Sequence, residues 1–257
     1  ILLLGLYSFA IEPNNITTTS LSVKDNLISS SLDGYKIVLV SDPHIHELGL
    51  RENWAINMIK KADPDLIIIP GDIIVSENGV MPATEFIHKL ADITETIVVW
   101  GNWDHWSGVD LQYFKSLLEG HSNVKVLVND ALRIREGLVI VGIDDPYTSY
   151  DNLDLALKSV VEEPVFTVLA AHSPEIIDSA KGKINLILAG HTHGGQVVIP
   201  FIGPIFVPLS EQYKKYTYGL FETGGTRMFV TRGLGTSVFP VRFMCPPEIV
   251  VITFVSG

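Results

Sequence analysis

The fold is decided by the stretch Ile184-Asn185-Leu186-Ile187-Leu188-Ala189-Gly190-His191-Thr192-His193-Gly194-Gly195-Gln196. Its short, continuous apolar run is typical of a buried strand in a parallel sheet. His191 and His193 are two residues apart, so on an extended segment both side chains point the same way and can bind one cation or two adjacent ones. Gly194 and Gly195 allow the backbone to approach a ligand closely. The stretch therefore predicts a strand that ends in metal ligands.

Four other apolar runs also end in residues that can bind a metal ion. We expect these ends to lie together, because an α/β scaffold places its chemistry at the C-terminal ends of its strands. Carboxylate, amide and imidazole form a set of ligands suited to Mn²⁺, Fe or Zn²⁺, and less well to Ca²⁺. The runs and their polar ends are residues 35–40 with Asp42-Pro43-His44, residues 66–69 with Gly71-Asp72, residues 97–100 with Gly101-Asn102, and residues 165–170 with His172.

The number of histidines in these blocks decides between a metal site and ordinary polar residues. Any single histidine matches a motif more often by chance than by function. Of the eight histidines, however, only His88 and His121 lie apart from the blocks. We therefore predict two divalent metal ions, with Mn²⁺ favoured over Fe, Zn²⁺ or Mg²⁺, that bind a phosphate and activate water. The histidines in the blocks are His44, His172, His191 and His193, and those beside the blocks are His46 and His105.

Apolar strands that alternate with helical patterns predict an α/β fold with buried, largely parallel pairing. The strands are too many for one open sheet, so we expect two packed mixed β-sheets flanked by helices, in one domain over residues 32–257. Residues 14–31 form a polar lead-in with an edge strand near residues 20–23. The expected helices are residues 52–62, 82–92, 109–119, 153–160 and 174–180, and the further strands are residues 138–143, 196–199, 227–231 and 248–254.

Composition argues against two classes of protein. The net charge of −11 over 257 residues opposes nucleic-acid binding, which relies on Lys and Arg to neutralise phosphates, so no nucleic-acid partner is expected. The single cysteine, Cys245, excludes an intramolecular disulfide and a thiolate-rich zinc site. With 47% hydrophobic residues, the chain can bury a full core.

The N-terminal segment, residues 1–11, is uncharged and strongly apolar and begins with Ile rather than Met. It is shorter than the roughly 20 apolar residues that a membrane-spanning helix needs. We expect residues 1–31 to comprise the remnant of a signal or anchor helix and the polar lead-in that follows it. The alternative is a first strand or helix packed on the core.

In this order, five blocks resemble the calcineurin-like metallophosphoesterase superfamily: Asp42-Pro43-His44, Gly71-Asp72, Gly101-Asn102-Trp103-Asp104, His172 and Gly190-His191-Thr192-His193. The resemblance extends over residues 35–254 and implies an αββα sandwich with a dinuclear centre at one end of the sheets. It also implies the ligands of each metal ion. One ion would be held by Asp42, His44 and His193, the other by Asn102, His172 and His191, and Asp72 would bridge the two.

Longer strings narrow the resemblance to a membrane-associated bacterial branch, which includes exported phosphodiesterases and UDP-2,3-diacylglucosamine pyrophosphatases. The resemblance implies a phosphorylated small molecule or lipid as substrate, with contact to a membrane surface. It implies a location at the bacterial inner membrane or outside it, while a cytoplasmic location stays open. The strings are residues 190–196, residues 231–237, Pro240-Val241-Arg242 and Cys245-Pro246-Pro247-Glu248-Ile249.

The chain departs from the family at Trp103, where the family usually has a histidine assigned to protonating the leaving group or stabilising charge on the phosphate. An indole cannot transfer that proton. His105 from an extended loop, or His46 across the site, could take its place; the alternative is that both lie outside the site or on the surface. A leaving group that is itself a phosphate monoester departs without protonation, so the change favours cleavage of a pyrophosphate or an activated diester.

Two features concern the substrate. Residues 199–208 form an apolar run broken by Pro and Gly directly after the metal motif. This run is either a buried loop or short hairpin, or an apolar lip that meets acyl chains or the bilayer surface. Arg232 is the candidate to bind the substrate phosphate, and a structural ion pair is the alternative.

The predicted activity is metal-dependent hydrolysis of a phosphodiester or pyrophosphate bond, with a lipid-linked substrate such as UDP-2,3-diacylglucosamine. Asn102 would stabilise the developing charge and Asp104 would orient neighbouring groups. A protein phosphatase is disfavoured because the arginine-containing continuation after Gly71-Asp72 is missing, and a nuclease is disfavoured by the acidic charge. A scaffold of the same fold used for protein interaction is disfavoured because all seven expected ligands are present.

Overall fold

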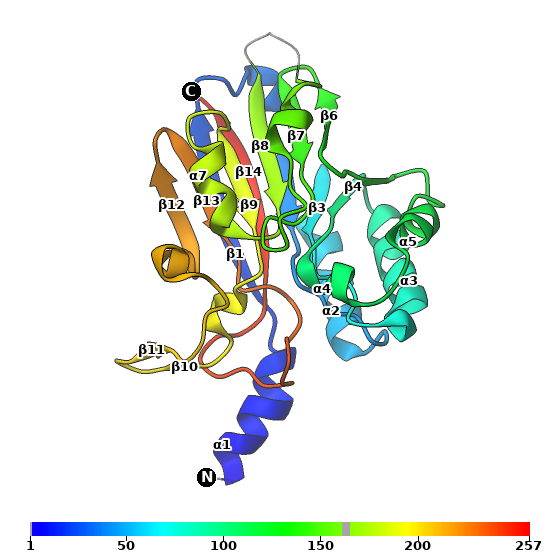
Figure 1. Ribbon diagram of the computed structural model, residues 1–257, viewed down its shortest axis with the longest axis vertical. Helices are drawn as coiled ribbons and strands as arrows, with labels where there is room; N and C mark the ends of the chain where they lie inside the picture. Colours follow the sequence, from blue (N-terminus) through cyan, green and yellow to red (C-terminus); the bar gives the residue numbers. More distant parts are fainter. Residues whose placement is uncertain (1, 161–164) are drawn as a thin grey trace.

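The computed structural model describes residues 2–160 and 165–257 and arranges them in four layers, with two six-stranded sheets between two layers of helices (Figure 1). The first sheet has the order β1-β14-β2-β3-β4-β5. Its neighbouring strands are parallel except for the β14–β2 pair. The strands are β1 (Thr17–Asp25), β14 (Glu248–Ser256), β2 (Lys36–Leu39), β3 (Leu66–Pro70), β4 (Thr96–Val99) and β5 (Val124–Val126).

The second sheet has the order β12-β13-β9-β8-β7-β6. Its central strands are parallel, and each edge strand is antiparallel to its neighbour. The expected two mixed sheets are therefore confirmed. The strands are β12 (Gly219–Thr223), β13 (Thr226–Val230), β9 (Leu186–Ala189), β8 (Phe166–Ala171), β7 (Leu138–Gly142) and β6 (Asp130–Arg135).

The helices cover the outer face of each sheet because the central strands are apolar on both faces. In β2, Ile37 and Leu39 pack between the sheets, whereas Val38 packs against the helices of the first sheet. Those helices are α2 (Leu50–Ala62), α3 (Val80–Ala91) and α5 (Leu111–Leu118); α6 (Leu153–Leu157) and α7 (Ile177–Ala180) cover the second sheet. Short 3-10 turns at Glu12–Asn14, Ser30–Leu32, Glu77–Gly79, Pro174–Ile176, His193–Gly195 and Glu211–Tyr216 connect these elements.

Several elements differ from the expected boundaries. The edge strand expected near residues 20–23 is the nine-residue β1, and the helix expected to reach residue 160 ends at Leu157. The sequence pattern missed β5, β6, β12 and the short helix α4 (Asn102–Trp106). Residues 196–199 contribute only β10 (Val198–Ile199), which forms a hairpin with β11 (Gly203–Pro204).

The N-terminal segment is helical and projects from the end of the sandwich opposite the C-terminus (Figure 1). It comprises α1 (Leu2–Leu6) and a π-helical turn (Tyr7–Ile11), and Ile1 lies outside the described residues. Leu3, Leu6 and Phe9 are exposed, so this face of the segment has no protein partner among the residues that the structure describes. Within residues 2–160 and 165–257, no helix has both the length and the apolar character to cross a membrane.

Candidate metal centre

The loops that follow β2, β3, β4, β8 and β9 bring all seven expected metal ligands to one end of the two sheets. Their carboxylate and imidazole atoms form two buried groups, each with its ligand atoms within 4.8 Å of one another. Asp72 belongs to both groups and is therefore in position to bridge two metal ions. The first group is Asp42, His44, Asp72 and His193, and the second is Asp72, His172 and His191. Asn102 joins the second group through its Oδ1, which lies 3.1 Å from His172 Nε2.

Backbone carbonyls orient two of the imidazoles. His172 Nδ1 lies 2.8 Å from the carbonyl oxygen of Pro70, and His191 Nε2 lies 2.8 Å from that of Pro208. Because a carbonyl only accepts hydrogen bonds, each of these nitrogens carries the proton and donates it. The remaining nitrogens, His172 Nε2 and His191 Nδ1, face each other at 3.1 Å. Such carbonyl partners are typical of metal-binding histidines, because they fix which nitrogen is free.

In the first group, two ring nitrogens face each other at hydrogen-bond distance. His44 Nε2 lies 3.1 Å from His193 Nε2, and the Nδ1 atoms of both rings are buried without a hydrogen-bond partner among the described residues. Burial lowers the pKa of His44 to about 4 and lowers the pKa of His193 well below its ordinary value. Both imidazoles are therefore neutral near pH 7, which is the state that binds a metal ion.

The carboxylates of the site also require positive charge. Burial, followed by the charge of Asp72, raises the pKa of Asp42 to about 6. Burial acts the same way on Asp72, but the charge of His172 and its hydrogen bond outweigh it and hold the pKa of Asp72 at about 2. His172 Nε2 lies 3.2 Å from Asp72 Oδ2; burial opposes a positive charge on His172, but the charge of Asp72 and this contact raise the pKa of His172. The donor set fits two divalent cations.

The backbone is strained at five of the seven expected ligands. Asp42, His44, Asp72, His191 and His193 all have φ between 44° and 70°. This left-handed conformation costs about 1–3 kcal/mol for a residue other than glycine and persists only where the surroundings enforce it. Strain of this kind is concentrated at functional sites, which supports a functional role for the cluster.

Close packing of glycines brings the loops together. A Cβ atom at Gly190 would lie 1.9 Å from Ser41 Oγ and 2.3 Å from Asp42 Oδ2. One at Gly101 would lie 2.4 Å from Asp72 Oδ1. Glycine is therefore required at both positions for the ligand loops to approach each other.

Asp104 and the backbone of Trp103 form hydrogen bonds to the ligand loops. The fully buried carboxylate of Asp104 accepts hydrogen bonds from the backbone N–H groups of Ile73 (2.9 Å), Ile74 (3.1 Å) and Gly101 (2.9 Å). It thereby ties the loop after β3 to the loop after β4. The backbone N–H of Trp103 donates to Asp72 Oδ1 at 2.7 Å, and the indole packs edge-on against His44 with ring centroids 5.9 Å apart.

The three expected substrate-side residues lie outside the cavity beside the metal ligands. His105 Nε2 lies 2.7 Å from Asp144 Oδ1; burial opposes the positive charge of His105, but this contact and the nearby charges raise its pKa. Arg232 forms an ion pair with Glu248 at 2.8 Å, which is the structural alternative expected from the sequence. His46 is exposed.

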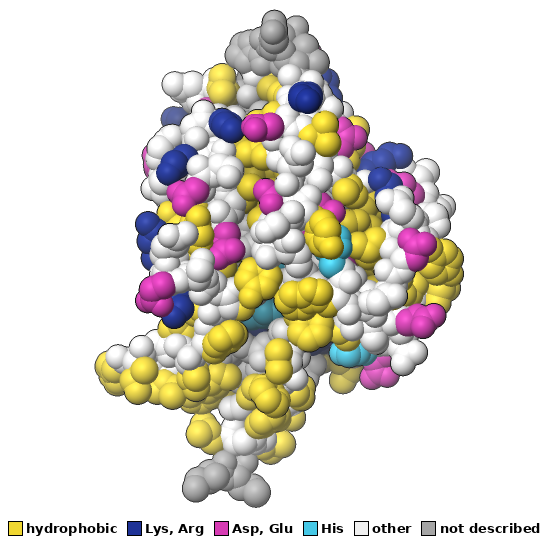
Figure 2. Space-filling view, in the orientation of Figure 1, with side chains coloured by type: hydrophobic (Ala, Val, Ile, Leu, Met, Phe, Trp, Pro, Cys, Tyr) yellow, Lys and Arg dark blue, Asp and Glu magenta, His cyan; other side chains and the backbone are white. Residues whose placement is uncertain are grey.

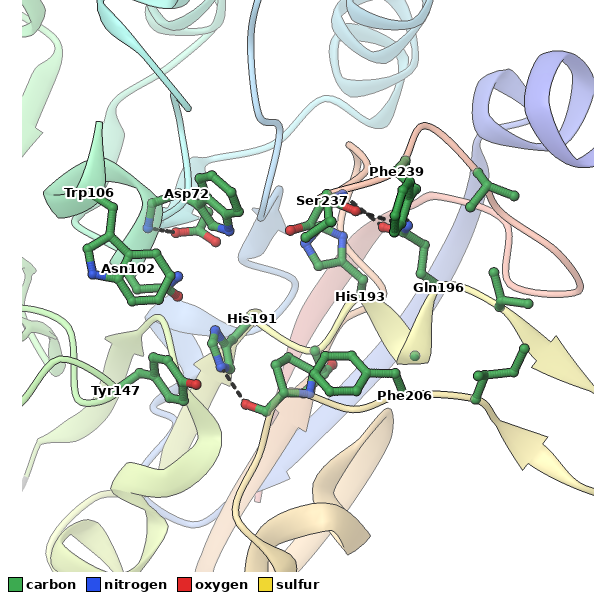
Figure 3. Close-up of a pocket in the computed structure, with 18 residues that line it drawn as sticks. Asp72, Asn102, Trp106, Tyr147, His191, His193, Gln196, Phe206, Ser237 and Phe239 are labelled. Carbon is green, nitrogen blue, oxygen red and sulfur yellow. Dashed lines mark hydrogen bonds between the residues drawn. The ribbon is translucent and has the colours of Figure 1, made fainter. Parts of the chain in front are cut away.

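The cavity has a volume of about 560 Å³ and is bounded by Asp72, Asn102, His191 and His193 at its base (Figure 3). The sequence pattern did not indicate Trp106 or Tyr147 as residues of its wall. The metal ligands were predicted because polar residues follow apolar strands. The same signal is present near Tyr147, which follows β7 and the polar residues Asp144 and Asp145. The apolar wall comprises Trp103, Trp106, Tyr147, Phe206, Val238 and Phe239, among others.

The fold and the paired ligand groups define a phosphoesterase with a dinuclear-type metal site. The sequence model of the calcineurin-like phosphoesterases matches residues 35–195, and the chain belongs to that family. An uncharacterized metallophosphoesterase of Bacillus subtilis (strain 168), YkuE, is 35% identical over an alignment of 266 positions, gaps included, that covers 98% of this chain and 91% of that protein. Phosphodiesterase YaeI of Escherichia coli (strain K12) is 27% identical over an alignment of 230 positions, gaps included, that covers 86% of this chain and 82% of that protein.

Among solved structures, the protein TT1561 of Thermus thermophilus has the same fold, with a TM-score of 0.54 and 13% identity. The similarity extends over 78% of this chain and 90% of that one. The chain is therefore a phosphoester hydrolase of the metallophosphoesterase class, as its sequence blocks predicted.

Proposed function

We propose that this enzyme hydrolyses a phosphodiester or pyrophosphate bond in a substrate that carries an apolar group, such as an acylated nucleotide sugar of the UDP-2,3-diacylglucosamine type. The observation that carries the proposal is the wall of the cavity. Its base is formed by the expected metal ligands, whereas most of its exposed surface belongs to aromatic and aliphatic side chains such as Trp106, Phe206 and Phe239. A site of this kind binds an apolar body and holds a phosphate at one end.

Charge favours a diester or pyrophosphate over a monoester. Among the described residues that line the cavity, none is a lysine or arginine. A phosphate monoester carries close to two negative charges at neutral pH, whereas each phosphoryl group of a diester or substituted pyrophosphate carries one. A cavity whose positive charge comes from metal ions alone therefore suits the less charged group.

The side chains at the base would bind two metal ions, and the mixture of carboxylate, amide and imidazole ligands favours Mn²⁺. We propose that Asp42, His44 and His193 hold one ion, that Asn102, His172 and His191 hold the other, and that Asp72 bridges them. Bound metal ions would polarise the phosphate and activate the attacking water. Asn102 also lines the cavity, so its amide can contact the phosphate where negative charge develops.

An apolar surface beside the cavity supports contact with a membrane. Three segments form this surface, which we call the apolar end: the N-terminal helical segment (residues 2–11), the β10–β11 hairpin and the loop of residues 238–244. They are joined by backbone hydrogen bonds, from Arg242 to Ser8 (2.9 Å) and from Val198 to Phe243 (2.9 Å). Hydrophobic side chains gather at this end of the molecule (Figure 2). The exposed ones include Leu3, Leu6, Phe9, Phe201, Ile202, Val238, Phe239 and Met244.

The geometry of the apolar end favours a lipid surface as its partner. The side chain of Phe201 is fully exposed at the tip of the hairpin, and Ile202 beside it is 78% exposed. Projecting apolar tips of this kind insert into the headgroup region of a bilayer. Phe239 belongs both to this surface and to the cavity wall, and the exposed Phe206 of the wall follows the hairpin, so an acyl chain could pass from the bilayer to the site along apolar side chains.

The substrate class is tested by offering the Mn²⁺-loaded enzyme UDP-2,3-diacylglucosamine, unacylated UDP-N-acetylglucosamine, a cyclic nucleotide and an aryl phosphodiester. We expect hydrolysis of the aryl diester and a kcat/KM for the acylated substrate that is at least about 10-fold above that of its unacylated counterpart, because several buried methylenes each contribute to binding. Equal rates with and without acyl chains would remove the lipid-linked substrate. Absence of any hydrolysis would contradict the proposed reaction.

Membrane contact is tested with the double variant Phe201→Ser/Ile202→Ser, whose side chains lie outside the cavity lining. We expect its partition onto vesicles of phosphatidylethanolamine and phosphatidylglycerol to fall at least about 10-fold, because two apolar side chains no longer insert. Cosedimentation with the vesicles measures the partition. Met81→Ser, which changes an exposed side chain on α3, should bind as the unchanged protein does. If the double variant sediments equally well, the hairpin does not bind the bilayer.

A further inference from the structure

Tyr147 presents a free hydroxyl to the cavity. Two other polar side chains of the wall donate their hydrogen bonds within the protein: the Thr192 hydroxyl to the carbonyl of Thr217 at 2.6 Å, and the Gln196 amide to the carbonyl of Phe239 at 3.0 Å. The Tyr147 hydroxyl has no hydrogen-bond partner among the residues that the structure describes, and it points toward His191 at the base of the cavity (Figure 3).

Aromatic packing fixes the ring of Tyr147 next to the second group of metal ligands. Its centroid lies 4.5 Å from that of His191, with the two planes inclined by 44°. On its other side the ring meets Trp106 edge-on, with centroids 6.1 Å apart. The ring therefore lies in the cavity wall beside the second group of metal ligands, with its hydroxyl on the cavity side.

A chain of hydrogen bonds holds the backbone of Tyr147 in this place. The buried carboxylate of Asp145 accepts hydrogen bonds from the N–H groups of Tyr147 (3.2 Å) and Thr148 (2.8 Å) and from the Thr148 hydroxyl (2.7 Å). The N–H of Asp145 in turn donates to Asp144 Oδ1 at 2.8 Å, the same oxygen that His105 Nε2 contacts at 2.7 Å.

His105 connects this loop to the metal centre because it lies on α4, one turn from Asn102. The ring of Tyr150, from the other end of the loop, stacks on His105 with centroids 4.4 Å apart. The loop of residues 144–150 is thus attached to the short helix that supplies a metal ligand.

We propose that the Tyr147 hydroxyl donates a hydrogen bond to the phosphoryl group of the substrate, and that His105 is a positioning residue that holds Tyr147 through Asp144 and Asp145. A preorganised donor of this kind stabilises negative charge on phosphoryl oxygens. It suits a cavity whose described lining has no lysine or arginine. The inference rests on the proposed function for the identity of the ligand as a phosphoryl group.

The test of the hydroxyl is Tyr147→Phe, which keeps the ring against His191. We expect the affinity of the Mn²⁺-loaded protein for inorganic phosphate, measured by calorimetry, to fall about 10- to 100-fold, because a hydrogen bond to a charged group is lost. The kcat/KM for an aryl phosphodiester should fall by a similar factor. Tyr113→Phe is the matched control, since Tyr113 is exposed on α5 and lies outside the cavity lining, and it should bind phosphate within about twofold of the unchanged protein.

The metal content of each variant and the phosphate-binding measurement separate the possible outcomes. Tyr147→Phe with two metal ions and unchanged phosphate affinity would overturn the proposal. Loss of metal in this variant would also overturn it, because Tyr147 would then act by supporting His191. If the unchanged protein binds phosphate but hydrolyses no ester, the proposed function fails, whereas the phosphate affinities still decide the role of Tyr147.

The positioning role of His105 is tested by a double-mutant cycle. His105→Ala should weaken phosphate binding about three- to tenfold when Tyr147 is present but less than about twofold in the Tyr147→Phe background. The effects of two substitutions are not additive when one residue acts through the other. His105→Gln, which can still donate to Asp144, should restore most of the affinity. Equal losses in both backgrounds would show that His105 does not act through Tyr147.

Discussion

Asp72→Asn should lower turnover of a phosphodiester by at least about 10³-fold and reduce the metal content from two ions to one or none. Asp72 is the carboxylate that both ligand groups share, and an amide in its place has neither the charge nor the second anionic oxygen. The fold should persist, because the side-chain oxygen of asparagine can still accept the hydrogen bond from the Trp103 N–H. Turnover and elemental analysis on the same purified sample measure the two effects together.

The matched control is Asp154→Asn on α6. Asp154 is exposed and contacts only Lys183, at 3.2 Å, in the part of the chain that the structure describes. It should keep two metal ions and a turnover within about twofold of the unchanged enzyme, because an exposed ion pair contributes little. An Asp72→Asn enzyme that retains both ions and normal turnover would refute the assignment of Asp72 as the bridging ligand.

Arg242→Ala should lower the free energy of unfolding by about 3–5 kcal/mol. The guanidinium of Arg242 is fully buried and donates to the carbonyls of Gly235, Cys245 (2.9 Å) and Arg232 (2.8 Å). Burial lowers its pKa to about 10, so it stays charged at neutral pH. Alanine would leave these carbonyls buried without a donor and would open a cavity behind the loop that carries Val238 and Phe239.

Urea denaturation measures the loss of stability. Arg133→Ala on β6 is the control, because Arg133 is exposed, and it should change the free energy of unfolding by no more than about 0.5 kcal/mol. Arg242→Lys should lie between the two, since an ammonium group supplies three donors from one point and cannot reach every carbonyl. An alanine variant as stable as the unchanged protein would show that the loop does not depend on Arg242.

The sandwich and the gathering of the ligands were predictable because one local pattern repeats. The runs that became β2, β3, β4, β8 and β9 are continuous and apolar, and each is buried on both faces. Parallel strands of this kind place their C-terminal ends together, so the polar residues that follow them converge without any long-range information.

The elements that the sequence pattern missed carry weak local signals. β5 has only three residues, too few to show a period. β6 is an edge strand in which Arg133 and Arg135 alternate with Leu132 and Ile134, and it has no fully buried residue. A one-sided edge strand with charged residues resembles a loop in sequence, although it completes the sheet in the structure.

The roles of Arg242 and Tyr147 could not be predicted for a different reason. Arg242 is surrounded by backbone carbonyl groups instead of a carboxylate. Every residue has a backbone carbonyl, so the sequence does not indicate which of them will surround an arginine. Tyr147 lines the cavity because its loop is attached to α4 through His105 and Asp144, which are 39 positions apart. Contacts of this kind depend on the finished fold rather than on neighbouring residues.

The left-handed backbone at five of the expected metal ligands bears on whether folding or metal binding comes first. The ligands extend from Asp42 to His193, and the unfolded chain does not hold them in that conformation or in one place. We therefore expect metal to bind after the two sheets have assembled. Because affinity alone discriminates poorly among divalent metals, the ions acquired will be those available where folding is completed. The compartment in which the new chain completes its folding would thus help to determine which metal ions it binds.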